Sequence, residues 1–152
     1  NFVFKIIGSG PRLPYIQDLI NNLGLEGNIQ LLPPIPKSEI YHATSTTNCF
    51  IFNLRPASVF QYGISPNKLL DYMAIGRPII FCADNWPNPL EQAGTVIYAK
   101  PSNPQSIAIA MLEVMSYSQL KLNDLGATYR SYVLNHHSFD TLARTLATTL
   151  SL

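Results

Sequence analysis

Residues 63–78 read GISPNKLLDYMAIGRP, a stretch that predicts a loop, a helix and the start of a strand. Ser65 has the character of a helix N-cap, and Pro66 follows at the expected first helical position, where its missing N–H costs nothing. The pattern predicts a helix that runs to about Ile75 and stops at the glycine that follows. Residues 78–82 then read as a buried strand.

The polar residues of this predicted helix share one side. Asn67, Lys68 and Asp71 stand at i, i+1 and i+4, and the apolar residues cover the core-facing side. Free N–H groups at a helix start attract phosphate, and an anion there would offset the unfavourable position of Lys68 in the first turn. Asp71, one turn on, could accept hydrogen bonds from ribose hydroxyls. Spacing leaves one alternative open, a Lys68–Asp71 surface pair that contributes about 0.2–0.5 kcal/mol.

Strand and helix signals alternate along the whole chain. Strands are expected over residues 2–7, 28–32, 48–54, 78–82 and 95–98, and a long loop over residues 55–64. The other helices are expected over about 12 residues before Gly24 and over residues 37–44, 88–93, 104–115, 118–134 and 139–150. Continuous apolar strands that alternate with helices imply a parallel sheet covered on both faces. The fold class is therefore α/β, a doubly wound, Rossmann-like sheet of five strands.

A second candidate binding segment follows the first predicted strand. Gly8, Ser9 and Gly10 form a glycine turn at the carboxyl end of that strand, where ligands bind in open α/β sheets. The dinucleotide fingerprint G-x-G-x-x-G is incomplete, because position 13 is leucine. A tight strand-to-helix turn without a ligand is the alternative interpretation.

Composition narrows the possible functions. The 152 residues are 47% apolar and 12% charged, with a net charge of +1, so no basic surface for nucleic acid is expected. No apolar run approaches the roughly 18 residues of a spanning helix, and no signal peptide is recognised. Cys49 and Cys82 lie in apolar runs and read as buried free thiols, which favours the cytoplasm.

The segment 63–78 resembles the donor site of GT-B glycosyltransferases of the group 1 type, family GT4. It is most similar to a bacterial surface-polysaccharide branch that reads G-x-S-P-x-K-L-(F/L)-(E/D)-Y-M-A-x-G-(K/R)-P. Residues 6–11, 28–33 and 95–98 and the last three helices fit the family in order. The resemblance implies that residues 1–152 are one nucleotide-sugar-binding domain, the C-terminal half of a GT-B fold. The first β-α unit and the N-terminal acceptor domain, with the usual catalytic base, would lie upstream of Asn1.

The resemblance also implies roles for single residues. Lys68 would contact the donor diphosphate, Asn67 and the turn amides would support it, and Asp71 would bind the ribose. The first acid of the family's usual pair would fall at Gly63, so that carboxylate is missing. The expected donor-binding set is Gly8, Ser9, Gly10, Ser65, Pro66, Asn67, Lys68 and Asp71.

The implied reaction is retaining transfer from a UDP- or GDP-sugar, in surface polysaccharide or glycolipid synthesis. No bound metal is expected, because the sequence has no D-x-D motif and no His/Cys ligand cluster. The expected location is the cytoplasm, at the inner face of the membrane, with contacts to the N-terminal domain and peripheral membrane contact through the missing half. Two alternatives stay open: a dinucleotide-dependent Rossmann oxidoreductase domain, and a non-catalytic α/β module for partner contact.

Overall fold

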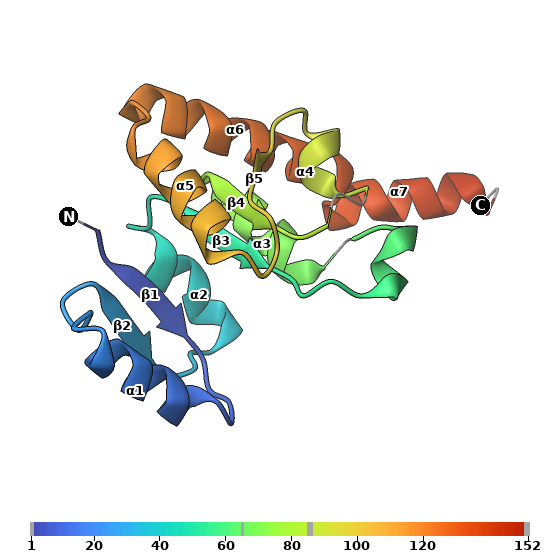
Figure 1. The fold of residues 1–152 in the computed structure, drawn as a ribbon. Helices are drawn as coiled ribbons and strands as arrows, with labels where there is room; N and C mark the ends of the chain where they lie inside the picture. Colours follow the sequence, from blue (N-terminus) through green and yellow to red (C-terminus); the bar gives the residue numbers. More distant parts are fainter. Residues whose placement is uncertain (1, 65, 85–86, 151–152) are drawn as a thin grey trace. The chain divides into compact units, whose positions relative to one another are not determined.

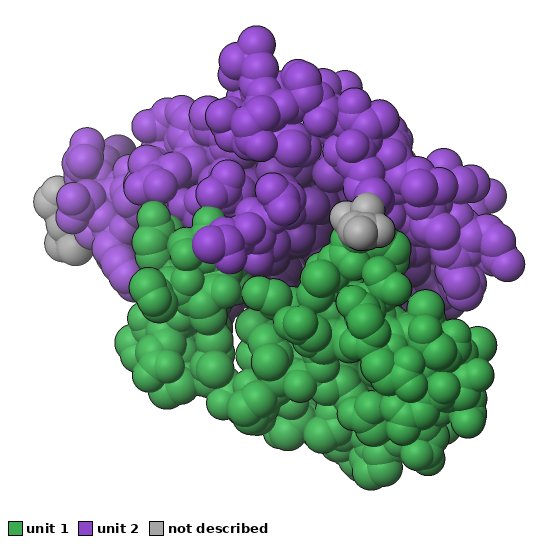
Figure 2. All heavy atoms as spheres, turned by 90° about the vertical axis from the view of Figure 1, so that its left-hand side faces the viewer, with its two compact units in different colours: residues 1–45 green, residues 46–152 purple. Residues whose placement is uncertain are grey.

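The computed structural model describes residues 2–64, 66–84 and 87–150. The chain folds as two compact units, Asn1–Ser45 (unit 1) and Thr46–Leu152 (unit 2), which Figure 2 shows in different colours. Each unit contains its own parallel strands. The strands and helices are labelled in Figure 1.

Unit 1 is built on two parallel strands, β1 (Phe4–Ile7) and β2 (Ile29–Leu32). Helix α1 (Leu13–Asn22) connects them, and helix α2 (Lys37–Thr44) follows β2. Gly24 follows α1 with φ of +62°, a left-handed conformation that glycine adopts at low cost. The helix therefore stops before Gly24, as the sequence predicts. Ile20 of α1 is 4% exposed and is a core residue of this unit.

Unit 2 is built on three parallel strands in the order β3 (Phe50–Asn53), β4 (Ile79–Cys82) and β5 (Ile97–Tyr98). Its helical elements are the 3₁₀ helix η1 (Ser58–Tyr62), α3 (Asn67–Ile75), α4 (Pro89–Gln92), α5 (Pro104–Met115), α6 (Gln119–His136) and α7 (Phe139–Thr149).

Helices cover both faces of the unit 2 sheet (Figure 1). All four residues of β4 are buried, as a central parallel strand requires. Ile79 and Phe81 face a core shared with α3, α4 and α6, whereas Ile80 and Cys82 face α5 and the first half of α6. The predicted doubly wound arrangement is confirmed, because alternate residues of one strand pack against helices on opposite sides.

Two glycines allow α3 and α6 to approach closely. Gly76 ends α3 with φ of +77°, which confirms the predicted stop. A Cβ placed on Gly126 of α6 would lie 2.1 Å from the carbonyl oxygen of Gly76. Any larger residue at position 126 must therefore displace backbone.

The five predicted strands are present among the described residues: β1 pairs with β2 in unit 1, and β3, β4 and β5 pair in unit 2, all in parallel. The predicted loop over residues 55–64 is only partly a loop, because it contains η1. That element is a short run of i→i+3 turns, in which Phe60 N–H donates to Ala57 and Gly63 N–H donates to Phe60. Five residues are too few to show a helical period in the sequence.

The tail helix α7 exposes its apolar stripe. Ser138 caps the helix, since its side chain accepts a hydrogen bond from Thr141 N–H. Leu142, Leu146 and Leu150, at i, i+4 and i+8, are 47%, 59% and 56% exposed. An apolar stripe identifies an amphipathic helix, but it does not show that this chain supplies the surface that covers it.

Candidate functional site

Helix α3 separates its apolar and polar residues as the sequence predicts. Leu69 and Met73 are 0% exposed, and Leu70 and Ala74 pack against the same core. Asn67 and Lys68 are exposed, and Asp71 is half-buried. The apolar side therefore fixes the helix in unit 2, while Asn67 and Lys68 on the polar side are exposed to solvent.

The first turn of α3 begins one residue later than predicted. Pro66 has ψ of 138°, an extended value, and its carbonyl oxygen accepts from the N–H groups of Leu69 at 2.9 Å and Leu70 at 3.4 Å. Pro66 is thus the residue before the helix rather than its first residue, and its side chain has no polar atom for capping. The predicted N-cap, Ser65, lies outside the described residues. The first N–H groups of a helix have no partner within it, and here they belong to Asn67 and Lys68.

The segment before α3 is anchored to the loop that follows β4. Ile64 is 4% exposed, and its N–H donates to the carbonyl oxygen of Pro87 at 2.9 Å. Gly63 has φ of +115°, a conformation that side chains rarely adopt, and a Cβ there would meet the same carbonyl at 3.6 Å. The backbone at position 63 therefore disfavours any residue with a carboxylate. Asn85 and Trp86, which the sequence places in the loop after β4, lie outside the described residues.

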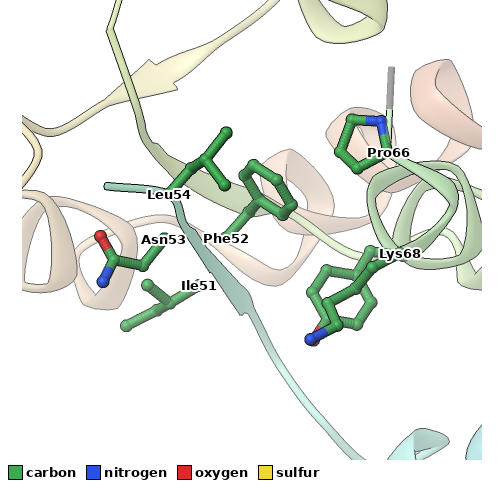
Figure 3. Close-up of a pocket in the computed structure, with 7 residues that line it drawn as sticks. Ile51, Phe52, Asn53, Leu54, Pro66 and Lys68 are labelled. Atoms are coloured by element: carbon green, nitrogen blue, oxygen red, sulfur yellow. The ribbon is translucent and has the colours of Figure 1, made fainter. Parts of the chain in front are cut away.

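A cavity of about 360 Å³ joins the start of α3 to the carboxyl end of β3 (Figure 3). Figure 3 shows Lys68 extending from α3 with its ammonium group directed away from the helix. The described lining residues come from two segments, the strand end and the helix start: Ile51, Phe52, Asn53, Leu54, Pro66, Lys68 and Tyr72.

The chemistry of this pocket suits an anion beside apolar groups. Lys68 supplies a positive charge, and Asn53 supplies a carboxamide at the end of β3. The other lining side chains are apolar or aromatic, so they lower the local dielectric and strengthen the attraction between a cation and an anion. Burial, and then the neighbouring charge of Asp71, raise the pKa of Tyr72 above its ordinary value of 10. Its phenol therefore stays neutral near pH 7 and adds no negative charge.

The structure brings some predicted site residues together but not all of them. Pro66 and Lys68 line the pocket with Asn53 and Tyr72, which the sequence analysis missed. Asn67 and Asp71 lie on the same helix but are not among the described lining residues. Two simple signals point to the missed residues, since one ends a strand and the other follows Lys68 by one helical turn.

The glycine turn belongs to unit 1. Gly8 N–H donates to Leu32 at 3.0 Å, and the carbonyl oxygen of Gly10 accepts from Leu13 N–H at 3.1 Å. Apart from the adjacent residues of the chain, no described atom lies within 4 Å of a Cβ built on Gly8 or Gly10. This turn, with Ser9 at its centre, thus has room for a group to approach its backbone, and its role in donor binding stays a prediction.

The fold and the pocket together define a class: an α/β protein with parallel strands whose candidate site lies at the carboxyl end of a strand and the start of a helix. Within that class, residues 1–117 match the model of the family described as group 1 glycosyl transferases. The chain belongs to this family, as the resemblance of residues 63–78 implies.

The fold of this chain is also similar to that of a solved structure. The chain is similar to the pneumococcal O-GlcNAc transferase GtfA, solved in complex with UDP and GlcNAc, with 19% sequence identity and a TM-score of 0.65. The match covers 98% of this chain and 29% of that chain, so these residues span less than a third of GtfA. The likeness supports the fold of a GT-B glycosyltransferase domain. No curated protein matches the chain.

The described residues form neither a metal site nor a membrane-spanning helix. No group of three or more His, Cys, Asp or Glu side chains is placed to hold a metal ion in residues 2–64, 66–84 and 87–150. Over the same ranges, no helix has both the length and the apolar character that crossing a membrane requires.

Proposed function

We propose that this chain is the donor-binding domain of a retaining glycosyltransferase that uses a nucleoside-diphosphate sugar, with UDP or GDP as the nucleotide. One observation carries the proposal: Lys68, in the first turn of α3, lines a pocket at the carboxyl end of β3. Membership of the group 1 glycosyltransferases supports it and favours transfer over an oxidoreductase or a non-catalytic module.

In this proposal the domain acts mainly by stabilising the leaving group. Cleavage of the bond to the sugar leaves negative charge on the departing diphosphate. The Lys68 ammonium and the first amides of α3 are preorganised donors for that charge in a partly apolar site. A fixed cation can supply the neutralisation without a bound metal ion.

The remaining expected residues take supporting roles. Asp71 is half-buried one turn beyond Asn67, where a carboxylate can accept from ribose hydroxyls. The sequence GSG of unit 1 offers an open backbone turn, and Pro66 and Asn67 stand at the start of α3, whose first amides would meet the diphosphate. The expected role of Ser65 in donor binding concerns a residue outside the described ranges. Since position 63 disfavours a side chain, the donor sugar would be recognised without a carboxylate from that position.

The rest of the reaction requires groups that we assign to another part of the enzyme. Because the chain spans 29% of GtfA, we propose that a further, N-terminal domain holds the acceptor and the catalytic base. The pattern of residues 63–78 further suggests family GT4 and surface polysaccharide or glycolipid synthesis. Such synthesis would place the enzyme in the cytoplasm at the inner membrane face, with membrane contact through that other domain.

Nucleotide titration tests this function. UDP, GDP and NADH are titrated separately into the 152-residue chain by calorimetry. We expect saturable binding of UDP or GDP and none of NADH. Binding of NADH alone would support an oxidoreductase domain, and a folded chain that binds none of the three would contradict the proposal.

A further inference from the structure

The ring of Tyr72 connects the pocket to the core of unit 2. Tyr72 follows Lys68 by four residues on α3, so the two side chains lie on one side of the helix, and both line the pocket. The Tyr72 ring stacks on Phe50 of β3, with ring centroids 4.2 Å apart and ring planes 6° apart. Phe50 is 7% exposed and belongs to the buried core cluster.

The stacking partner is itself held in place. Phe50 pairs with Ile79 in the β3–β4 ladder, and its N–H donates to Pro78 at 2.9 Å. A ring stacked on such a residue has little freedom to rotate. Tyr72 therefore presents a fixed, flat apolar surface at the pocket.

A fixed surface matters for a lysine. The lysine side chain has a flexible four-carbon stem, and holding it in one geometry costs conformational entropy. Such stems pack along apolar surfaces while the ammonium stays in water. A ring one turn away on the same side of the helix provides that surface in advance of ligand binding.

We infer that Tyr72 is a positioning residue for donor binding, whose ring, held by Phe50, supports the stem of Lys68 and aims its ammonium group at the donor diphosphate. The inference rests on the proposed function, since it concerns the same pocket. It assigns the effect to the ring rather than to the hydroxyl. The hydroxyl stays neutral, because burial and the charge of Asp71 keep the pKa of Tyr72 above 10.

A double-mutant cycle tests the inference in the 152-residue chain. Affinity for UDP and GDP is measured by calorimetry for the native chain, Tyr72→Leu, Lys68→Ala and the double variant, with thermal melts to verify folding. We expect Tyr72→Leu to weaken binding roughly fivefold and Tyr72→Phe less than about twofold. Lys68→Ala should cost less in the Tyr72→Leu background than in the native chain, because the two residues act together.

A matched control separates positioning from general loss of packing. Tyr98→Leu removes an aromatic contact with Phe81, at 5.9 Å between centroids, from a residue that does not line this pocket. It should lower stability without coupling to Lys68→Ala. If Tyr72→Leu does not fold, Tyr72→Met replaces it in the same cycle.

The outcomes are distinguishable. Additive losses from Tyr72→Leu and Lys68→Ala, or unchanged affinity in Tyr72→Leu, would overturn the positioning role and leave the proposed function intact. A loss in Tyr72→Phe as large as in Tyr72→Leu would also overturn it, because the hydroxyl would then be the active group. Absence of UDP and GDP binding by the folded native chain would remove both proposals.

Discussion

Single residues determine how closely the elements of unit 2 pack, and Gly126 is the clearest case. A Cβ at this position would lie 2.1 Å from the carbonyl oxygen of Gly76 and 3.2 Å from the nitrogen of Arg77. Both atoms belong to the backbone, so the clash cannot be relieved by rotating a side chain. Gly126 thus sets the distance between α3, which carries Lys68, and α6.

We expect Gly126→Ala to lower the free energy of unfolding by about 1–3 kcal/mol, the usual cost of overpacking. Helix propensity alone would make alanine more stable than glycine by about 1 kcal/mol. A loss of stability in Gly126→Ala would therefore indicate the clash with the Gly76 backbone. Urea denaturation measures it. Gly27→Ala is the control, because no described atom lies within 4 Å of a Cβ at Gly27. A Gly126→Ala variant as stable as the native chain would contradict the close packing.

The two cysteines make a second prediction at this scale. Burial raises the pKa of Cys82 to about 11. Burial is also the largest cause of the raised pKa of Cys49, which is about 12. A pKa raised well above pH 8 favours the neutral thiol, so little of either cysteine is thiolate at that pH. We expect slow reaction with a disulfide reagent in the native chain and fast reaction of both thiols in urea. The predicted burial is confirmed for Cys82, whereas Cys49 is half-buried. Immediate reaction of Cys82 without urea would contradict its burial.

At the scale of elements, the loop between β4 and α4 holds the segment that leads into α3. Asn88 is 1% exposed, and its side-chain oxygen accepts from Leu90 N–H at 3.0 Å and Glu91 N–H at 3.2 Å. The preceding residue, Pro87, accepts from Ile64 N–H. The Asn88 cap of α4 therefore also stabilises the backbone at Pro87, which holds the segment before α3.

We expect Asn88→Ala to cost about 1–3 kcal/mol of stability, because it removes a cap and leaves buried amides without a partner. Asn103 provides the matched control, since it caps α5 through Ser106 N–H at 2.8 Å but is only half-buried. Asn103→Ala should cost about 1 kcal/mol. Equal denaturation midpoints for the two variants would show that burial of Asn88 adds nothing.

Much of the element order can be read from local sequence. The start of α5 at Pro104 and the end of α3 at Gly76 follow directly from capping chemistry, and the left-handed Gly24 follows the Leu23 cap of α1. Strand ends were less accurate, since β1 begins at Phe4 rather than residue 2. Strand limits depend on hydrogen-bonded neighbours, which a run of apolar residues does not identify.

At the scale of the whole molecule, tertiary pairing is what the sequence pattern could not supply. Hydropathy predicts five parallel strands, but it does not give their partners, which are β2 for β1 in unit 1 and the order β3-β4-β5 in unit 2. The pocket also depends on tertiary packing that the sequence pattern does not show. Asn53 and Lys68 are separated along the chain by η1 and line one pocket because Leu69 and Met73 dock α3 against the β3 core. Residue spacing could identify Lys68, but not the β3 residues that line the pocket with it.

The central claim is that Lys68 binds the diphosphate of the donor nucleotide. The most direct measurement is calorimetric titration of UDP and GDP, and of the corresponding nucleosides, into the native chain, Lys68→Ala and Lys100→Ala. Lys100 is an exposed lysine of unit 2 that does not line the pocket, so it controls for net charge. We predict that Lys68→Ala weakens nucleotide binding about ten- to hundredfold, that Lys100→Ala changes it little, and that nucleoside binding is equal in all three. Nucleotide binding by Lys68→Ala as tight as by the native chain would contradict the account.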